Sequence, residues 1–209
     1  MTHPVAIENT QPLVDSMNKP HGWCTGAEQA ELARLAEGRY VLEIGGWQGL
    51  STIALARAAD FVVTLDHWQG DADTERVAGP HTREQLLPRW LANIHTAGLA
   101  AKVAPFCGVL GDVLTLLDPR HFGLIFYDAD HDADSTRFAL DWAWPGMVER
   151  AAMGLPTTIA VHDFKPQNQR YAETNATILE WASRHRLEMQ RVDSLAIFSG
   201  CPVETPQSD

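Results

Sequence analysis

Several features that would define other classes of protein are missing from this sequence. No apolar run approaches the roughly 20 residues that a membrane-spanning helix needs. The first residues lack the basic and apolar regions of a signal peptide. Only three cysteines occur, at positions 24, 107 and 201, and they lack metal-ligand spacing. Because an odd, sparse set of cysteines suits a reducing compartment, we expect a cytoplasmic protein without membrane contact.

Positive charge is also scarce. The 209 residues include 16 Lys and Arg against 27 Asp and Glu, which gives a formal net charge of -11. This balance repels phosphate backbones, so we exclude nucleic acid as a partner. The hydrophobic fraction of 45% is that of an ordinary globular protein. We expect one domain over residues 22–200, an irregular lead-in over 1–21 and a frayed tail over 201–209.

Short apolar runs alternate with segments of helical periodicity along the chain. We predict strands over 41–45, 61–66, 102–106, 123–128 and 157–163, and helices over 25–38, 50–59, 82–97, 113–117, 134–144 and 170–186. The central strands are apolar throughout, which is typical of a parallel sheet covered on both faces. Strands over 187–192 and 194–199 are separated by Asp193 alone, so they must form an antiparallel hairpin. The prediction is an α/β fold with a doubly wound, mostly parallel, seven-stranded sheet.

A glycine-rich turn, residues 43–51, follows the first predicted strand. In open α/β sheets ligands bind outside the carboxyl ends of the strands, and Gly45, Gly46 and Gly49 allow the backbone to approach a ligand closely. A tight turn that needs glycine for geometry alone would look the same. The spacing argues against phosphate cofactors. Trp47 and Leu50 occupy positions where a dinucleotide fingerprint needs glycine, and no P-loop motif occurs.

An acidic residue, Asp66, ends the adjacent predicted strand 21 residues after Gly45. A carboxylate there can accept hydrogen bonds from both hydroxyls of a ribose. A strand-end acid or a helix cap is the alternative interpretation. Together the turn and the acid predict a nucleoside-binding crevice that lacks a phosphate cradle, and S-adenosylmethionine is the common cofactor of that description.

Four motifs resemble those of class I S-adenosylmethionine-dependent methyltransferases: VLEIGGWQGLST at 41–52, TLDHWQGD at 64–71, IFYDADH at 125–131 and IAVHDF at 159–164. Over roughly residues 22–199 the chain is similar to the small bacterial branch with macrocin-type sugar O-methyltransferases. The resemblance implies that the turn shapes the methionine pocket and that Trp68 flanks the adenine. Gly108-Val109-Leu110 replaces the Gly-Asp-Ser-like adenine turn of many relatives. We assign cofactor binding to Glu43, Gly45, Gly46, Trp47, Gly49, Ser51, Asp66, Trp68, Leu110 and Asp128.

Acidic and histidine residues follow two strands that the resemblance places side by side. The resemblance implies a divalent cation, Mg²⁺, Mn²⁺ or Fe²⁺, held here by Asp128, His162 and Asp163, which would lower the pKa of the acceptor hydroxyl. Alternatives remain open. Successive strand side chains point oppositely, so His162 and Asp163 need not share a face. Asp128 can instead hold the methionine amine, and His131 can cap a helix or act as a metal-free base.

These features predict an enzyme that transfers a methyl group from S-adenosylmethionine to a small hydroxylated molecule, a sugar or a natural product. We expect His131 to be the base that removes the acceptor proton, with His162 second and His67 third. Residues 67–81 form a candidate lid, and tryptophan-rich patches favour a homodimer. Two alternatives are a metal-dependent hydroxylase or hydrolase that uses the same cluster, and a non-catalytic nucleoside-binding relic.

Overall fold

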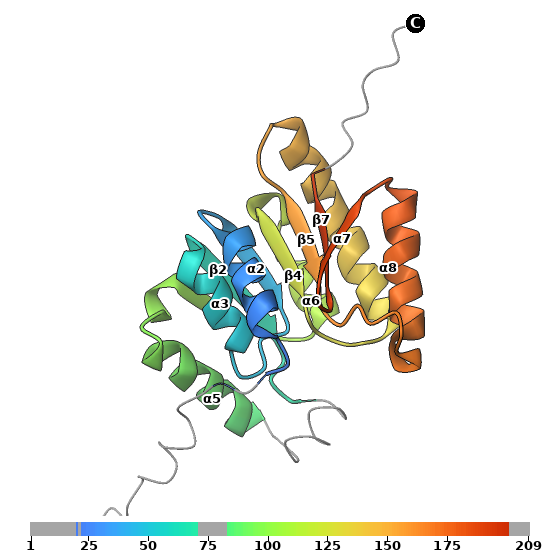
Figure 1. Ribbon diagram of the computed structural model, residues 1–209. Coiled ribbons are helices and arrows are strands. Elements are labelled where there is room, and N and C mark those ends of the chain that lie inside the picture. The colour runs from blue at the N-terminus through green and yellow to red at the C-terminus, as the bar shows by residue number, and fades with distance from the viewer. Residues whose placement is uncertain (1–19, 21, 71–82, 201–209) are drawn as a thin grey trace, which may run out of the picture.

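A single mixed sheet organises the molecule (Figure 1). The computed structural model describes residue 20, residues 22–70 and residues 83–200. The other residues of the predicted lead-in and lid, the whole predicted tail, and residue 82 of the helix predicted over 82–97 lie outside the described residues. The strand order is β3-β2-β1-β4-β5-β7-β6. The strands are β1 (Tyr40–Ile44), β2 (Phe61–Asp66), β3 (Val103–Cys107), β4 (Leu124–Tyr127), β5 (Thr158–Val161), β6 (Met189–Val192) and β7 (Leu195–Ser199).

The pairing of these strands confirms the predicted topology. All neighbouring pairs among β1 to β5 are parallel, and β7 runs antiparallel to both β5 and β6. The hairpin between β6 and β7 turns at Asp193, whose φ of 49° lies in the left-handed region. On one side of β1 the sheet continues with β2 and β3. On the other side it continues with β4 and β5. Loops therefore diverge at the carboxyl ends of β1 and β4, which is where such sheets bind ligands.

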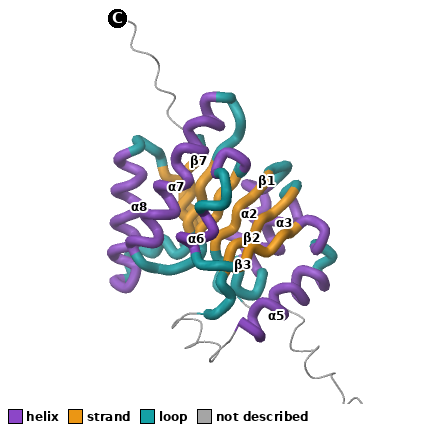
Figure 2. The backbone as a smooth tube through the Cα atoms, turned by 180° about the vertical axis from the view of Figure 1, so that it is seen from behind, coloured by secondary structure: helices purple, strands orange, loops and turns teal. Residues whose placement is uncertain are grey.

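Helices cover both faces of the sheet (Figure 1 and, from behind, Figure 2). Because side chains alternate along a strand, Val41 packs into one core cluster and its neighbour Leu42 into the other. The first cluster includes residues of α2 (Gly26–Ala36), α3 (Leu50–Ala58) and α5 (Arg83–Thr96); the second includes residues of α6 (Leu110–Leu114), α7 (Ala133–Ala152) and α8 (Ala172–Arg184). Short 3₁₀ turns are η1 (Ala100–Lys102), η2 (Pro119–His121) and η3 (Gln169–Tyr171). No helix among the described residues is both long and apolar enough to cross a bilayer.

Two helices differ from their predicted bounds. We expected α7 to end before Pro145, but it continues to Ala152. Proline removes one helical hydrogen bond and crowds the preceding turn. Here Gly146 and Met147 are buried just beyond it, and the packing of this half of α7 against η2 maintains the helix. The helix expected over 113–117 instead begins at Leu110, so α6 starts at the pocket.

The contact between α7 and η2 provides a test of this packing. A Cβ at Gly146 would lie 2.6 Å from the carbonyl carbon of Pro119. We expect Gly146→Ala to lower the free energy of unfolding by about 1–3 kcal/mol, the usual cost of overpacking. In Gly111→Ala, the control in α6, a Cβ would meet no atom within 4 Å, so stability should stay within about 1 kcal/mol. Urea denaturation measures both, and equal stabilities would contradict the packing described.

Candidate active site

A pocket opens where the loops diverge at the carboxyl ends of β1 and β4. Its walls come from seven parts of the chain. They are residues 22–24 before α2, the turn 44–51, the end of β2, Leu86 of α5, the start of α6, and the two segments that follow β4 and β5. The sequence motifs therefore meet in one place, as a ligand site at the reversal of strand order requires.

The carboxylate of Asp66 joins the glycine turn to the end of β2. Its Oδ2 accepts the backbone N–H groups of Gly46 and Trp47, each at 2.8 Å, and its Oδ1 accepts that of Trp68 at 2.6 Å. A carboxylate offers about four acceptor positions, so about one remains, on Oδ1. Asp66 can therefore accept one ribose hydroxyl while it keeps these bonds, not both as we expected.

Glycines in the turn are required by contacts within the protein. A Cβ at Gly45 would lie 2.0 Å from the carbonyl oxygen of Asp128, and one at Gly46 would lie 2.4 Å from Cγ2 of Thr64. Gly49 precedes α3 with a φ of 91° and does not line the pocket. The need for a tight turn thus explains these glycines without a ligand. Because position 45 carries no side chain, Asp128 lies directly beside the turn.

Glu43 lies beneath the turn with no exposure to solvent. Its carboxylate accepts the hydroxyl groups of Ser51 at 2.6 Å, Thr52 at 2.5 Å and Thr64 at 2.8 Å. Burial raises the pKa of Glu43 to about 7, although these hydroxyls favour the charged form. Glu43 does not line the pocket, whereas Ser51 does. Glu43 therefore shapes the turn by tying β1 and β2 to α3.

Three tryptophans near the turn have different positions. Trp23 and Trp47 line the pocket and stack on one another with centroids 4.7 Å apart. Trp68 is fully buried, packs 5.3 Å from Trp90 and donates its indole N–H to the carbonyl of Trp47. The expected contact of Trp68 with adenine was wrong, because the core encloses its ring. Leu110, the other residue expected near adenine, lines the pocket.

An acid–histidine group lines the pocket after β4 and β5. Asp128, His131 and Asp163 bring one potential ligand atom each to within 4.8 Å of the others. His131 Nε2 lies 2.6 Å from Asp163 Oδ2, and the Lys165 ammonium pairs with Asp163 Oδ1. Burial opposes ionisation of Asp163, but His131, the charge of His162 and Lys165 together lower its pKa below the usual range. The carboxylate therefore stays charged.

His162, predicted both as a base and as a metal ligand, is enclosed behind this group. Its side chain is 2% exposed, with Nδ1 3.0 Å from Asp128 Oδ1 and Nε2 3.2 Å from Glu28 Oε2. Burial opposes its protonation, yet the two carboxylates raise its pKa well above the usual value. His162 Nδ1 also lies 3.6 Å from Asp163 Oδ1, and His162 lines the pocket. The structure thus brings the predicted ligands Asp128, His162 and Asp163 together and adds His131 to them. His67 lies at the Asp66 end of the pocket, where its Nδ1 accepts the backbone N–H of Gln69.

Sequence reasoning missed the contacts of Glu28 and Ser194 with His162. Glu28 forms a capping box with Thr25 at the start of α2. The same carboxylate also accepts hydrogen bonds from the backbone N–H and hydroxyl of Ser194, at 2.8 and 2.7 Å. Burial opposes its ionisation, but bonds from His162, Ser194 and Thr25 lower the pKa of Glu28 to about 2. No local pattern signals contacts that span more than 130 residues.

Comparison with known proteins agrees with this geometry. A sequence family described as a methyltransferase domain matches residues 42–164, more than half of the chain. The chain belongs to the S-adenosylmethionine-dependent methyltransferases. The predicted enzyme class is therefore confirmed, while the narrower likeness to macrocin-type sugar O-methyltransferases stays a prediction.

Named relatives of this methyltransferase share either sequence or fold with it. Catechol O-methyltransferase of Mycobacterium tuberculosis is 36% identical over 104 residues, which are 48% of this chain and 40% of that protein. The chain thus matches less than half of that relative. The cofactor-bound structure of Rv0187 from MTB has a TM-score of 0.64 at 22% identity, covering 92% of this chain and 90% of that one. An O-methyltransferase from Bacillus cereus in complex with SAH has a TM-score of 0.57 at 20% identity, with coverages of 90% and 86%.

The buried Glu43 makes the stability of the methyltransferase depend on pH. A carboxyl whose pKa rises from 4.5 unfolded to about 7 folded destabilises the fold progressively between these pH values. The free energy of unfolding should fall by about 3 kcal/mol from pH 4.5 to above 7, relative to Glu43→Gln. Urea titrations across this range measure the difference between the two proteins, and parallel pH profiles would contradict a neutral Glu43 in the acidic range.

A substitution at Asp66 tests whether this carboxylate contributes to the affinity for the cofactor. In Asp66→Asn, an amide NH₂ replaces one acceptor, so at least one backbone N–H of the turn loses its partner. We expect the Kd for S-adenosylmethionine to rise about 10- to 100-fold, which corresponds to one or two lost hydrogen bonds to a charged group. Titration calorimetry measures the Kd. Asp60→Asn, an exposed acid before β2, is the matched control, and equal Kd values for the two variants would contradict this role.

Proposed function

We propose that this methyltransferase transfers the methyl group of S-adenosylmethionine to a hydroxyl oxygen of a small molecule. The observation that carries the proposal is the pairing of His131 with Asp163 beside Asp128, in the pocket that the glycine turn and Asp66 also line. A proton acceptor thus shares one pocket with the residues that we propose for the nucleoside. That is what oxygen methylation requires, because the acceptor hydroxyl must lose its proton as the new bond forms.

The pocket residues suit the parts of the cofactor. Asp66 offers its remaining Oδ1 acceptor position to one ribose hydroxyl, and the stacked indoles of Trp23 and Trp47 provide a flat apolar wall. Asp128, 23% exposed at the side chain, offers a carboxylate for a positively charged group of the methionine moiety. When bound, the cofactor supplies a methyl group on a positively charged sulfur. The protein aligns the acceptor with that methyl and excludes water.

His131 is the proposed base. Asp163 orients its imidazole through the 2.6 Å contact and stabilises the imidazolium that forms when it takes the acceptor proton, as the acid of a catalytic triad does. The Lys165 ammonium and the charge of His162 keep Asp163 ionised, so Asp163 remains able to stabilise that imidazolium. The ring of Tyr171 packs edge-on against His131 at 5.5 Å and limits its rotation.

The same three residues would also fit a divalent cation. Asp128 and Asp163 offer carboxylate oxygens and His131 an imidazole nitrogen within 4.8 Å of one another, a donor set typical of Mg²⁺, Mn²⁺ or Fe²⁺ sites. Such a cation would lower the pKa of an acceptor hydroxyl that it binds. In that case Asp163 and Asp128 act as ligands, and His131 ligates instead of serving as the base.

The proposed acceptor is a small molecule with neighbouring hydroxyl groups. A catechol and a sugar share this chemistry, and two relatives, the catechol O-methyltransferase and the Bacillus cereus protein, are named for oxygen methylation. The net charge of -11 disfavours polyanionic acceptors. One hydroxyl would deliver its proton to His131 while its neighbour binds beside Asp128.

His131→Gln tests the role of the base. We expect kcat for methyl transfer to a catechol or a methyl glycoside to fall about 10²- to 10⁴-fold, with the Kd for S-adenosylmethionine within a factor of two. Formation of S-adenosylhomocysteine is the measured product. His121→Gln, at the exposed turn η2, is the control.

Chelation separates the two versions of this proposal. Activity that survives exhaustive EDTA treatment supports the His131–Asp163 base, and activity lost to EDTA and restored by Mg²⁺ or Mn²⁺ supports a bound cation. An unchanged kcat in His131→Gln, or the absence of transfer to any hydroxylated acceptor, would contradict the proposed function.

A further inference from the structure

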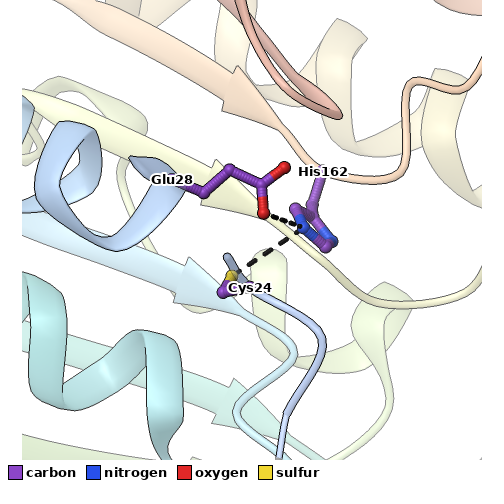
Figure 3. A group of neighbouring side chains, drawn as sticks. All are labelled: Cys24, Glu28 and His162. Atoms are coloured by element: carbon purple, nitrogen blue, oxygen red, sulfur yellow. Dashed lines mark hydrogen bonds and ion pairs between the residues drawn. The ribbon is translucent and has the colours of Figure 1, made fainter. Parts of the chain in front are cut away.

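Cys24, Glu28 and His162 form a second group of potential ligands, which adjoins the first through the contact of His162 with Asp128. Figure 3 shows the thiol, the carboxylate and the imidazole converging from the segment before α2, from α2 itself and from the end of β5. All three residues are buried, with Glu28 at 0% and His162 at 5% exposure. We propose that this trio is a binding site for Zn²⁺.

The distances in the trio match tetrahedral coordination. His162 Nε2 lies 3.8 Å from Cys24 Sγ and 3.2 Å from Glu28 Oε2. Around a tetrahedral zinc with ordinary bond lengths, the nitrogen–sulfur and nitrogen–oxygen separations are about 3.5 and 3.3 Å. All three ligand atoms lie within 4.8 Å of one another. The two separations from His162 Nε2 are thus within a few tenths of an ångström of the tetrahedral values.

Neighbouring groups orient these ligands as zinc proteins commonly do. His162 Nδ1 is 3.0 Å from Asp128 Oδ1, and a carboxylate that holds one imidazole nitrogen presents the other to a metal. The Glu28 carboxylate is fixed by the backbone N–H of Thr25 at 2.8 Å and by both donors of Ser194. Fixed ligands lose little conformational entropy when the metal binds.

Charge and proton balance also suit zinc. On binding, Zn²⁺ replaces the proton of the Cys24 thiol and the proton on His162 Nε2, so two protons leave. The thiolate and the Glu28 carboxylate then neutralise the two charges of the ion. One thiolate, one imidazole and one carboxylate are ligands that favour Zn²⁺ over Mg²⁺, which prefers oxygen donors alone.

Zinc at this position would strengthen one wall of the pocket. Cys24 and His162 both line it, and Glu28 belongs to the first turn of α2. The metal would tie the chain before α2 and the start of that helix to the end of β5. Three protein ligands leave a fourth position for an oxygen, such as water or the Ser194 hydroxyl, which lies 3.3 Å from His162 Nε2.

Metal analysis of the full chain tests the proposal without an activity assay. The protein is stripped with a chelator, dialysed against Zn²⁺ and analysed by mass spectrometry for bound metal, and Co²⁺ is used as a spectroscopic substitute. We expect one tightly held Zn²⁺ per chain and a thiolate-to-cobalt charge-transfer band. Cys24→Ala should lose that band and weaken zinc binding more than tenfold, since even residues behind the ligands contribute 10- to 100-fold.

Two further variants show which cysteine binds the metal and which group of ligands holds it. In Cys107→Ala/Cys201→Ala the only cysteine left is Cys24, so a retained cobalt band assigns the thiolate to Cys24 without altering the site. Asp163→Asn alters the first group of ligands and should retain the tightly bound zinc. The proposal is overturned if the unsubstituted chain retains no zinc, if Cys24→Ala binds it equally well, or if the single-cysteine protein shows no band. A proton shared by His162 and Glu28 then occupies the site instead.

Discussion

The close approach of the Gly45 backbone to the end of β4 determines how the rest of the active site is arranged. Gly45 N–H bonds to the Leu65 carbonyl of β2 at 2.8 Å, while Asp128 N–H bonds to the Ile44 carbonyl at the same distance. The turn thus lies between the ends of β2 and β4. Asp66 is the last residue of β2, and Asp128 directly follows β4. No side chain fits at position 45. This contact brings both acids to the lining of one pocket.

A series of buried charged residues in contact with one another holds Asp128 in place. Asp128 is held by His162, whose other nitrogen contacts Glu28, which is in turn fixed by Ser194 in the β6–β7 turn. Isolated buried charges would be very costly, but each of these has opposite charges or hydrogen-bond donors around it. The C-terminal hairpin therefore contributes to the site without reaching the pocket, because it fixes the group that positions Asp128.

The sheet, the turn and the strand-end acids could be predicted from the sequence because each follows from local rules. Apolar runs define the central strands, and Asp66 and Asp128 occur where those strands end. The misplacement of Trp68 has another origin. Whether a side chain after a strand faces the crevice or the core depends on backbone turns such as the positive φ of Trp68 and Asp163. The role of Glu28 depends on a partner 134 residues away, and the part of α7 beyond Pro145 packs on η2, which lies 26 residues earlier in the chain.

We expect the nucleoside of the cofactor to bind beside Asp66, in the pocket that the glycine turn and Asp128 line. A crystal structure with S-adenosylhomocysteine tests it most directly. The account predicts a ribose hydroxyl within hydrogen-bond distance of Asp66 Oδ1, the indoles of Trp23 and Trp47 beside the ligand, and the homocysteine end near Asp128. A ligand bound elsewhere, with the pocket beside Asp66 empty, would contradict it.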